Sequence, residues 1–241
     1  MAPESVVPPL WQSFADYGRA SVFYVDLKPD PDRETSAMAW LDASEKARWR
    51  GIRDGRTRRE FALCRAALRD LLLARIDCRN HQLSFEETEN DKPLAHVRGE
   101  PAPVSFNVSH SGPHGLIAVV PDGRVGIDVE DRAARRDFDG IASLTFTPAE
   151  QAELGAADGV RKPEFFYRIW TMKEALIKAL GLGLSLNPAR FEIPPAMRAG
   201  ARRCEFRFPH LPGDQWRLED LGNADFAAAI ATESTQLQQP A

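Results

Sequence analysis

Residues 114–130 read HGLIAVVPDGRVGIDVE. Two apolar runs rich in β-branched residues, 114–120 and 125–130, flank a Pro-Asp-Gly turn signal. Such runs on either side of a short turn are typical of a β-hairpin. The stretch therefore predicts two adjacent antiparallel strands near the middle of the chain.

The second of these strands carries two carboxylates. Asp128 and Glu130 are two positions apart, so they project from the same face, about 7 Å apart along the strand. Like charges this close repel each other unless water solvates them or a cation lies between them. Oxygen ligands in small number suit Mg²⁺, which keeps waters and takes its other ligands from substrate phosphates. The pattern indicates either a magnesium site or a solvent-exposed strand face.

Outward from this stretch, helix and strand patterns alternate along the chain. Helical periodicity predicts helices over 44–52, 58–76 and about 164–180, and Thr147, Pro148 and Glu150 predict the capped start of another. Apolar β-rich runs predict strands over 21–27, 82–88, 104–111, 190–193, 204–208, 216–221 and 226–232, and residues 29–34 read as a turn. Helices and strands mixed in this way indicate the α+β class.

Composition sets the broad class of protein. With 241 residues, 43% of them hydrophobic, the chain is long enough for one large domain or two modest ones. The three cysteines are isolated in sequence, which argues against a disulfide framework or a zinc site. The N-terminus lacks the features of a signal peptide, and no apolar run reaches the ~18 residues of a membrane span. We therefore expect a cytoplasmic protein without a membrane partner.

Basic residues concentrate in one segment of this mildly acidic chain. Residues 44–75 contain ten Lys or Arg and four Asp or Glu, whereas the whole chain has a net charge of −4. A local basic patch indicates an anionic partner, and the alternative is an ordinary solvated helix face.

Residues 169–184, IWTMKEALIKALGLGL, combine a helix with an unusual set of charges. Glu174 and Lys178 are one turn apart and lie off the apolar stripe, whereas Lys173 lies near the edge of the stripe. The core-facing stripe consists of Ile169, Met172, Leu176 and Leu180, and Gly181 is the expected left-handed cap. The pair is either a surface ion pair or part of a phosphoryl-transfer site.

The segment FNVSHSG (106–112) offers a hydroxyl and an imidazole, Ser109 and His110, where a strand meets a glycine turn. No G-x-S-x-G elbow surrounds the serine, so acyl transfer is not indicated. The two side chains either contact phosphate or cap backbone groups of the turn.

Three segments together resemble a known family. FNVSHSG (106–112), VGIDVE (125–130) and WTMKEALIKALGLGL (170–184), in this order and spacing, are similar to the signature motifs of the Sfp-type 4′-phosphopantetheinyl transferases. DKP (91–93) is similar to a further short motif of that family, which usually reads Gly-Lys-Pro, and Asp91 departs from it.

The resemblance implies an α+β fold of two similar α/β halves, related by a pseudo-twofold axis within a monomer, with the active site between them. The halves would be residues 1–121, with the basic segment, and residues 122–241, with the metal strand and the catalytic helix. The implied reaction moves 4′-phosphopantetheine from coenzyme A to a serine of an apo acyl or peptidyl carrier protein and releases adenosine 3′,5′-bisphosphate. The pathway served could be fatty-acid, polyketide or nonribosomal-peptide synthesis.

The resemblance also assigns roles. Glu174 and Lys178 would be catalytic, and Arg59 is the basic-patch arginine most favoured for a coenzyme A phosphate, with Arg56 and Arg65 as rivals. Phe166 and Trp170 are expected to pack rather than to touch substrate. The metal ligands for Mg²⁺ would be Asp128, Glu130 and Glu174. Coenzyme A would contact Arg59, Lys92, Pro93, Ser109, His110, Asp128, Lys173 and Lys178.

Three other functions remain open from the residues. Asp128, Glu130, Glu174 and Lys178 would also suit another Mg²⁺-dependent phosphotransferase or a nuclease. A non-catalytic coenzyme A-binding protein would not need these four residues intact. A nucleic-acid-binding protein would need aromatic groups within the basic segment, where only Trp49 and Phe61 occur, so no nucleic-acid partner is expected.

Overall fold

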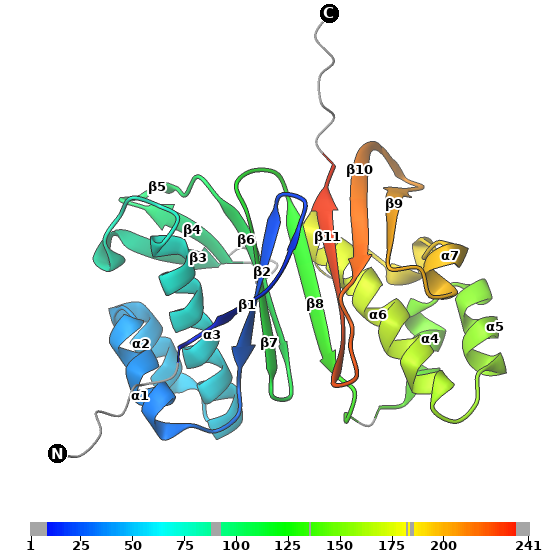
Figure 1. Ribbon diagram of the computed structural model, residues 1–241, viewed down its shortest axis with the longest axis horizontal. Coiled ribbons are helices and arrows are strands. Elements are labelled where there is room, and N and C mark those ends of the chain that lie inside the picture. The colour runs from blue at the N-terminus through cyan, green and yellow to red at the C-terminus, as the bar shows by residue number, and fades with distance from the viewer. Residues whose placement is uncertain (1–8, 88–92, 135, 182, 184–185, 235–241) are drawn as a thin grey trace, which may run out of the picture.

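Two four-stranded antiparallel sheets lie back to back in the computed structural model, with helices on the outer side of each (Figure 1). The structure describes residues 9–87, 93–134, 136–181, 183 and 186–234. The first sheet has the order β1-β2-β7-β6 and the second β8-β11-β10-β9. Their bounds are β1 (Gln12–Tyr17), β2 (Ala20–Asp26), β6 (Ser105–Ser111), β7 (His114–Val120), β8 (Val125–Asp131), β9 (Arg203–Phe208), β10 (Leu211–Asp220) and β11 (Phe226–Glu233). A smaller sheet contains β3 (Leu83–Glu87), β4 (Pro93–Val97) and β5 (Glu100–Pro101). The α+β class is confirmed.

The hairpin predicted over 114–130 is wrong, although both of its strands exist. β7 pairs with β2 and β6, whereas β8 pairs with β11, so the turn at 121–123 carries the chain from one sheet to the other. A Pro-Asp-Gly turn reverses the chain but does not dictate that the flanking strands bond to each other. Every residue of β7 is buried, and so is nearly all of β8, because each strand lies between the other sheet and a helix layer.

The predicted helices are present, and the caps predicted at Thr147 and Gly181 are confirmed. Thr147 and Glu150 form a complete capping box, and Gly181 ends the long helix at a φ of 71°. The helices are α1 (Pro31–Trp40), α2 (Ala43–Gly51), α3 (Gly55–Leu73), α4 (Phe138–Thr145), α5 (Pro148–Ala156), α6 (Arg161–Leu180) and α7 (Pro195–Arg198). None of the described helices is both long and apolar enough to cross a membrane.

Two local predictions are corrected. Residues 29–34 do not form a simple turn, because Asp30 caps α1 and Pro31 is its first residue. Residues 190–193 do not form a strand: the segment leaves a short 3₁₀ turn at Pro188–Arg190, and Phe191 and Ile193 anchor it in the core.

Three apolar cores hold the layers together. One lies between α3 and the first sheet, and another between α6 and the second sheet. The third, which we call the inter-sheet core, contains Ala20, Val22, Leu116, Ala118, Val120, Val125, Ile127, Val129, Leu221, Phe226, Ala228 and Ile230. The inner face of each sheet is therefore buried by the other sheet, and the residues at their shared edge are held in place.

Candidate active site

The edge strands of the two sheets, β6 and β8, meet along a line of polar contacts that we call the polar seam. Asn107 Oδ1 accepts a hydrogen bond from the backbone N–H of Ile127 at 2.8 Å. Two residues further along β6, Ser109 Oγ accepts from the N–H of Val129 at 3.3 Å. These side chains take the place of a neighbouring strand's carbonyls, because buried backbone donors need a partner.

The polar seam also fixes the two carboxylates of β8. Ser109 Oγ donates to Asp128 Oδ1 at 2.9 Å, and Ser111 Oγ donates to Glu130 Oε2 at 2.8 Å. Both carboxylates are buried, Asp128 with 5% exposure and Glu130 with 8%. They do share one face, as predicted, but the alternative of a solvent-exposed strand face is wrong.

Lys178 joins this group from α6. Its ammonium group donates to Asp128 Oδ1 at 2.6 Å and to Ser109 Oγ at 3.0 Å. The other oxygen of Asp128, Oδ2, is buried and has no hydrogen-bond partner among the described residues. A buried carboxylate oxygen without a donor is costly, so this atom is available to a cation.

Glu130 has donors on both of its oxygens. Arg136 Nη2 bonds to Oε2 at 2.7 Å, and Trp170 Nε1 bonds to Oε1 at 3.1 Å. The indole ring of Trp170 also stacks on Phe166, with ring centroids 6.1 Å apart. Phe166 packs as expected, whereas Trp170 both packs and orients a carboxylate of the candidate site.

Glu174 lies on α6 one turn before Lys178, and its charge interacts with those of Asp128, Lys178 and Glu130. Burial raises the pKa of Glu174, and the negative charge of Asp128 raises it further, while Lys178 opposes the shift. The pKa of Glu130 is raised for the same first two reasons. Burial and the charge of Asp128 therefore disfavour the charged forms of both glutamates, and a shared cation would favour those charged forms.

A metal ion would have to bind with few protein ligands. In the part of the chain that the structure describes, no group of three or more His, Cys, Asp or Glu side chains gathers closely enough to hold a metal ion. The unpartnered oxygen of Asp128 and the mutual repulsion of the three carboxylates nevertheless fit a hard cation. Mg²⁺ suits such a set, since it retains several waters and uses phosphate oxygens as ligands.

Lys173 is not part of this group. Its side chain is 1% exposed, and its ammonium group pairs with Glu150 at 2.9 Å and donates to the carbonyls of Pro188 at 2.8 Å and Phe191 at 2.6 Å. Burial lowers the pKa of Lys173, and Glu150 opposes that shift. The ammonium group is thus buried and paired, and it ties α6 to the segment that follows it. Its burial argues against the expected contact of Lys173 with coenzyme A.

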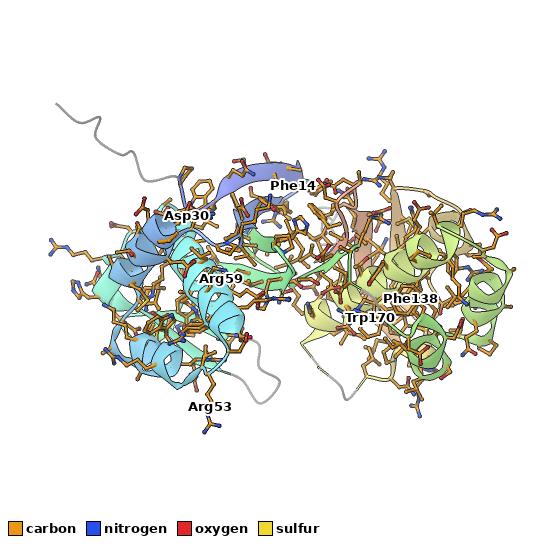
Figure 2. The ribbon with its side chains drawn as sticks, turned by 90° about the horizontal axis from the view of Figure 1, so that it is seen from below. Phe14, Asp30, Arg53, Arg59, Phe138 and Trp170 are labelled. Carbon is orange, nitrogen blue, oxygen red and sulfur yellow. The ribbon has the colours of Figure 1, made fainter. Side chains whose placement is uncertain are left out.

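The three candidate arginines of α3 differ in their surroundings. Arg65 pairs with Glu45 at 3.3 Å and lies over the ring of Phe85 at 4.3 Å, so its guanidinium group already has partners. Arg59 donates through Nε to the carbonyl of Leu27 at 3.0 Å. In Figure 2, Arg59 on α3 and Trp170 on α6 lie on opposite sides of the central strands.

Arg56 is the arginine that connects to His110. Arg56 Nε donates to Glu60 Oε1 at 2.7 Å, and His110 Nδ1 lies 3.6 Å from Glu60 Oε2. Burial lowers the pKa of His110, Lys178 and Arg56 lower it further, and Glu60 raises it. The imidazole therefore lies within the electrostatic reach of both α3 and α6.

Several residues of the site were not predicted. Asn107 and Ser111 could have been found, because with Ser109 they alternate at the strand period in FNVSHSG. Glu60 has a local partner in Arg56 on α3, but its proximity to His110 of β6 carried no local signal. Arg136 carried no local signal either, since its partner Glu130 lies on β8. Lys92 lies outside the described residues, and the neighbouring proline is the first residue of β4.

A cavity of about 600 Å³ lies elsewhere, at the N-terminal end of α6 between α5 and α7. Its walls include Glu153, Phe165, Arg168, Arg198 and Asp220, and none of the predicted site residues lines it. The arginines at its wall are already paired: Arg168 with Asp220 at 2.8 Å and Arg198 with Glu153 at 2.9 Å. This cavity and the carboxylates of the candidate site therefore lie at different ends of α6.

Comparison with known proteins agrees with the motifs. Residues 124–231 match the family model of the 4′-phosphopantetheinyl transferase superfamily. The Synechocystis sp. protein slr0495, a 4′-phosphopantetheinyl transferase by name, is 35% identical over 215 residues, covering 84% of this chain and 83% of that protein. The transferase HetI of Nostoc sp. is 30% identical over 169 residues, which cover 66% of this chain and 71% of HetI. The human L-aminoadipate-semialdehyde dehydrogenase-phosphopantetheinyl transferase is 31% identical, covering 53% of this chain and 44% of that protein. The resemblance drawn from the three motifs is confirmed, and the chain belongs to the 4′-phosphopantetheinyl transferase superfamily.

Proposed function

We propose that this protein transfers 4′-phosphopantetheine from coenzyme A to a serine of an apo acyl or peptidyl carrier protein and releases adenosine 3′,5′-bisphosphate. The observation that carries the proposal is the convergence of Asp128, Lys178 and Ser109 at the junction of the two sheets, beside Glu130 and Glu174. Carboxylates and a lysine in one partly buried site are the groups that a phosphoryl transfer needs.

The fold is proposed to consist of two related halves, residues 1–121 and 122–241, with coenzyme A between them. The order of elements supports this: β2, α3, β6 and β7 succeed one another in the first half, as β8, α6, β10 and β11 do in the second. The strand orders β2-β7-β6 and β8-β11-β10 also correspond. A pseudo-twofold axis would then relate α3 to α6, one on each side of the site.

Mg²⁺ is the proposed metal ion, with Asp128, Glu130 and Glu174 as its candidate ligands. Because these three do not form a closed cluster among the described residues, waters and coenzyme A phosphates would complete the coordination. The buried oxygen of Asp128 without a donor supports the assignment, as does the raised pKa of the two glutamates. When bound, the ion would neutralise charge on the pyrophosphate of coenzyme A.

The side chains of the protein supply the remaining steps. The carrier serine oxygen attacks the phosphorus next to pantetheine, the P–O bond to the departing adenosine bisphosphate breaks, and the Glu174 carboxylate takes the serine proton directly or through a water. Burial of Glu174, which raises its pKa, favours this role as a general base. Lys178 stabilises the negative charge that develops on the phosphoryl oxygens.

Phosphate binding falls to residues of the first half. Ser109 and His110 lie at the end of β6 beside Lys178, and Arg59, Lys92 and Pro93 remain the proposed contacts from the basic segment and the DKP motif. Lys173 is not one of the proposed coenzyme A contacts, because its ammonium group is buried against Glu150. The protein is proposed to act as a monomer, with coenzyme A and a carrier protein as partners.

Mass spectrometry of an apo carrier protein tests this function. Incubation with the protein, coenzyme A and Mg²⁺ should add one phosphopantetheine group to the carrier serine, and EDTA should prevent the addition. Asp128→Ala should abolish transfer, whereas Asp139→Ala, a change of an exposed residue on α4, should not. Absence of any adduct with acyl and peptidyl carriers alike would contradict the proposal, and full turnover in EDTA would contradict the metal role.

A further inference from the structure

Glu60 is a buried carboxylate within the most basic part of the chain. Glu60 lies on α3 and is 5% exposed. The surrounding segment, residues 44–75, carries ten basic side chains. One oxygen accepts from Arg56 Nε at 2.7 Å, and the other lies 3.6 Å from His110 Nδ1. One acid therefore lies between an arginine of α3 and an imidazole of β6, two elements of the first half.

The partners of Glu60 are much more exposed than Glu60 itself. The Arg56 side chain is 62% exposed and that of His110 is 41% exposed, against 7% for Glu60. An exposed arginine samples many rotamers, so holding it in one orientation costs entropy that a buried partner can offset in advance. With Nδ1 directed at Glu60, Nε2 is the imidazole nitrogen left for a ligand.

We propose that Glu60 is a positioning residue that holds Arg56 and His110 together as one phosphate-binding pair for the nucleotide portion of coenzyme A. The inference rests on the proposed function, because it takes the nucleotide from that reaction. The charges of Lys178 and Arg56 both act to lower the pKa of His110, which is consistent with the proximity of the three side chains. Glu60 itself touches no substrate and acts through its two partners.

A role in charge balance alone predicts the opposite result. If Glu60 only offsets the surrounding positive charge, removing its charge makes the site more attractive to phosphate and tightens binding. If Glu60 positions its partners, removing the charge frees them and weakens binding. The sign of the change in affinity therefore separates the two roles.

The experiment is calorimetric binding of adenosine 3′,5′-bisphosphate to wild type, Glu60→Gln and Glu60→Asp, alongside kcat and KM for coenzyme A. Glu60→Gln removes the charge and leaves the side-chain shape nearly unchanged. Glu60→Asp keeps the charge but shortens the side chain by one methylene, which moves the carboxylate away from its partners. Both variants should raise Kd and KM about five- to tenfold, with kcat changed less than about twofold, because binding rather than chemistry is affected. If one variant does not fold, the other carries the test.

Glu45→Gln is the matched control. Glu45 is another buried glutamate, at 6% exposure, and it pairs with Arg65 and Arg69 away from His110. The Glu45→Gln substitution should lower Tm while leaving the Kd for the bisphosphate within about twofold of the wild-type value. Equal weakening by Glu45→Gln would mean a general loosening of α2 and α3, and would overturn the inference.

The outcomes also separate this inference from the proposed function. Unchanged or tighter binding in Glu60→Gln and Glu60→Asp, with wild-type transfer intact, would overturn the positioning role and leave the function standing. The wild-type protein could bind the bisphosphate but transfer nothing, while both variants bind it more weakly. That result would overturn the function and leave the positioning role standing. Wild type that does not bind the bisphosphate would overturn the inference.

Discussion

At the scale of single residues, the ion pair between Lys178 and Asp128 is not the pair that the sequence suggests. From the sequence, Lys178 has a ready partner one turn away in Glu174, which would make an ordinary surface pair. In the folded chain, the ammonium group instead bonds to Asp128 at 2.6 Å, and Asp128 is 5% exposed. The lysine therefore neutralises a buried carboxylate of the candidate site.

We predict that Lys178→Ala lowers both activity and stability. Loss of the lysine leaves Asp128 buried without its cation, which should cost about 1–3 kcal/mol in the free energy of unfolding. Pantetheine transfer should fall at least about 100-fold, as for the loss of a preorganised electrostatic group. Thermal unfolding and a single-turnover assay measure the two effects separately.

A double-mutant cycle provides the control for this prediction. Asp128→Asn should recover most of the lost stability when it is combined with Lys178→Ala, because no unpaired charge then remains buried. Activity should not recover. If the two stability losses simply add, the pair is not coupled and its place in the site is wrong.

Glu174 leads to a prediction about pH. Its pKa is raised in the folded protein, so between the ordinary carboxyl pKa and the raised value the folded state binds more protons than the unfolded state. Stability should therefore fall as pH rises through this window, and the loss should persist at neutral pH. In EDTA, Glu174→Gln should flatten this part of the pH profile and raise Tm at neutral pH, while transfer falls at least about 100-fold.

Thermal unfolding across the acid-to-neutral range checks this prediction for wild type and for Glu174→Gln. Glu130 also has a raised pKa, so a residual slope should remain in the variant. An equal drop in Tm at acid and neutral pH would show that the carboxylate is not destabilised in the folded protein.

At the scale of elements, the distance between α6 and β8 sets the geometry of the site. A Cβ atom at Gly126 would lie 2.1 Å from the carbonyl oxygen of Ala175 and 2.3 Å from the N of Ala179. Only glycine allows the helix to approach this closely, and the approach brings Lys178 to Asp128. The glycine of VGIDVE is thus part of the packing that builds the site.

We predict that Gly126→Ala separates α6 from β8. Overpacking against helix backbone should cost about 1–3 kcal/mol or more, and transfer should fall because Lys178 moves away from Asp128. Gly155→Ala on α5 is the control, since a Cβ there meets nothing within 4 Å. The control should be stabilised by about 0.5–1 kcal/mol, as helical glycine positions are. A Gly126→Ala protein with normal Tm and turnover would contradict the tight packing.

At the scale of the whole molecule, the two sheets share one apolar interior. The inter-sheet core contains residues of both sheets, so neither half buries its inner face without the other. Because unfolding of one half would expose the apolar face of the other sheet, the two halves should unfold together.

We predict one cooperative unfolding transition for the whole chain. Tryptophan fluorescence and circular dichroism should give coincident curves. Leu116→Ala should shift both curves together by about 2–5 kcal/mol, because Leu116 is fully buried in the inter-sheet core. Leu144→Ala, at a side chain 75% exposed, should shift them by less than about 0.5 kcal/mol. Two separate transitions would mean that the halves fold independently.

The sequence by itself determined the features that depend on local period and local hydrogen bonding. The shared face of Asp128 and Glu130 follows from the strand period, the apolar stripe of α6 from the helix period, and the left-handed end at Gly181 from the absence of a side chain. The motif spacing also identified the family, because the motif side chains are held at fixed positions on these elements.

The tertiary structure alone decided which elements share a sheet and which charged groups are buried. The strands on either side of 121–123 belong to different sheets, because face-to-face burial of two apolar surfaces outweighs the pairing of neighbours in sequence. Lys173 and Glu60 look like surface charges in the chain, yet both are buried against partners from other segments. A side chain's dielectric surroundings and its partners depend on what folds over it, and residues distant in sequence supply that.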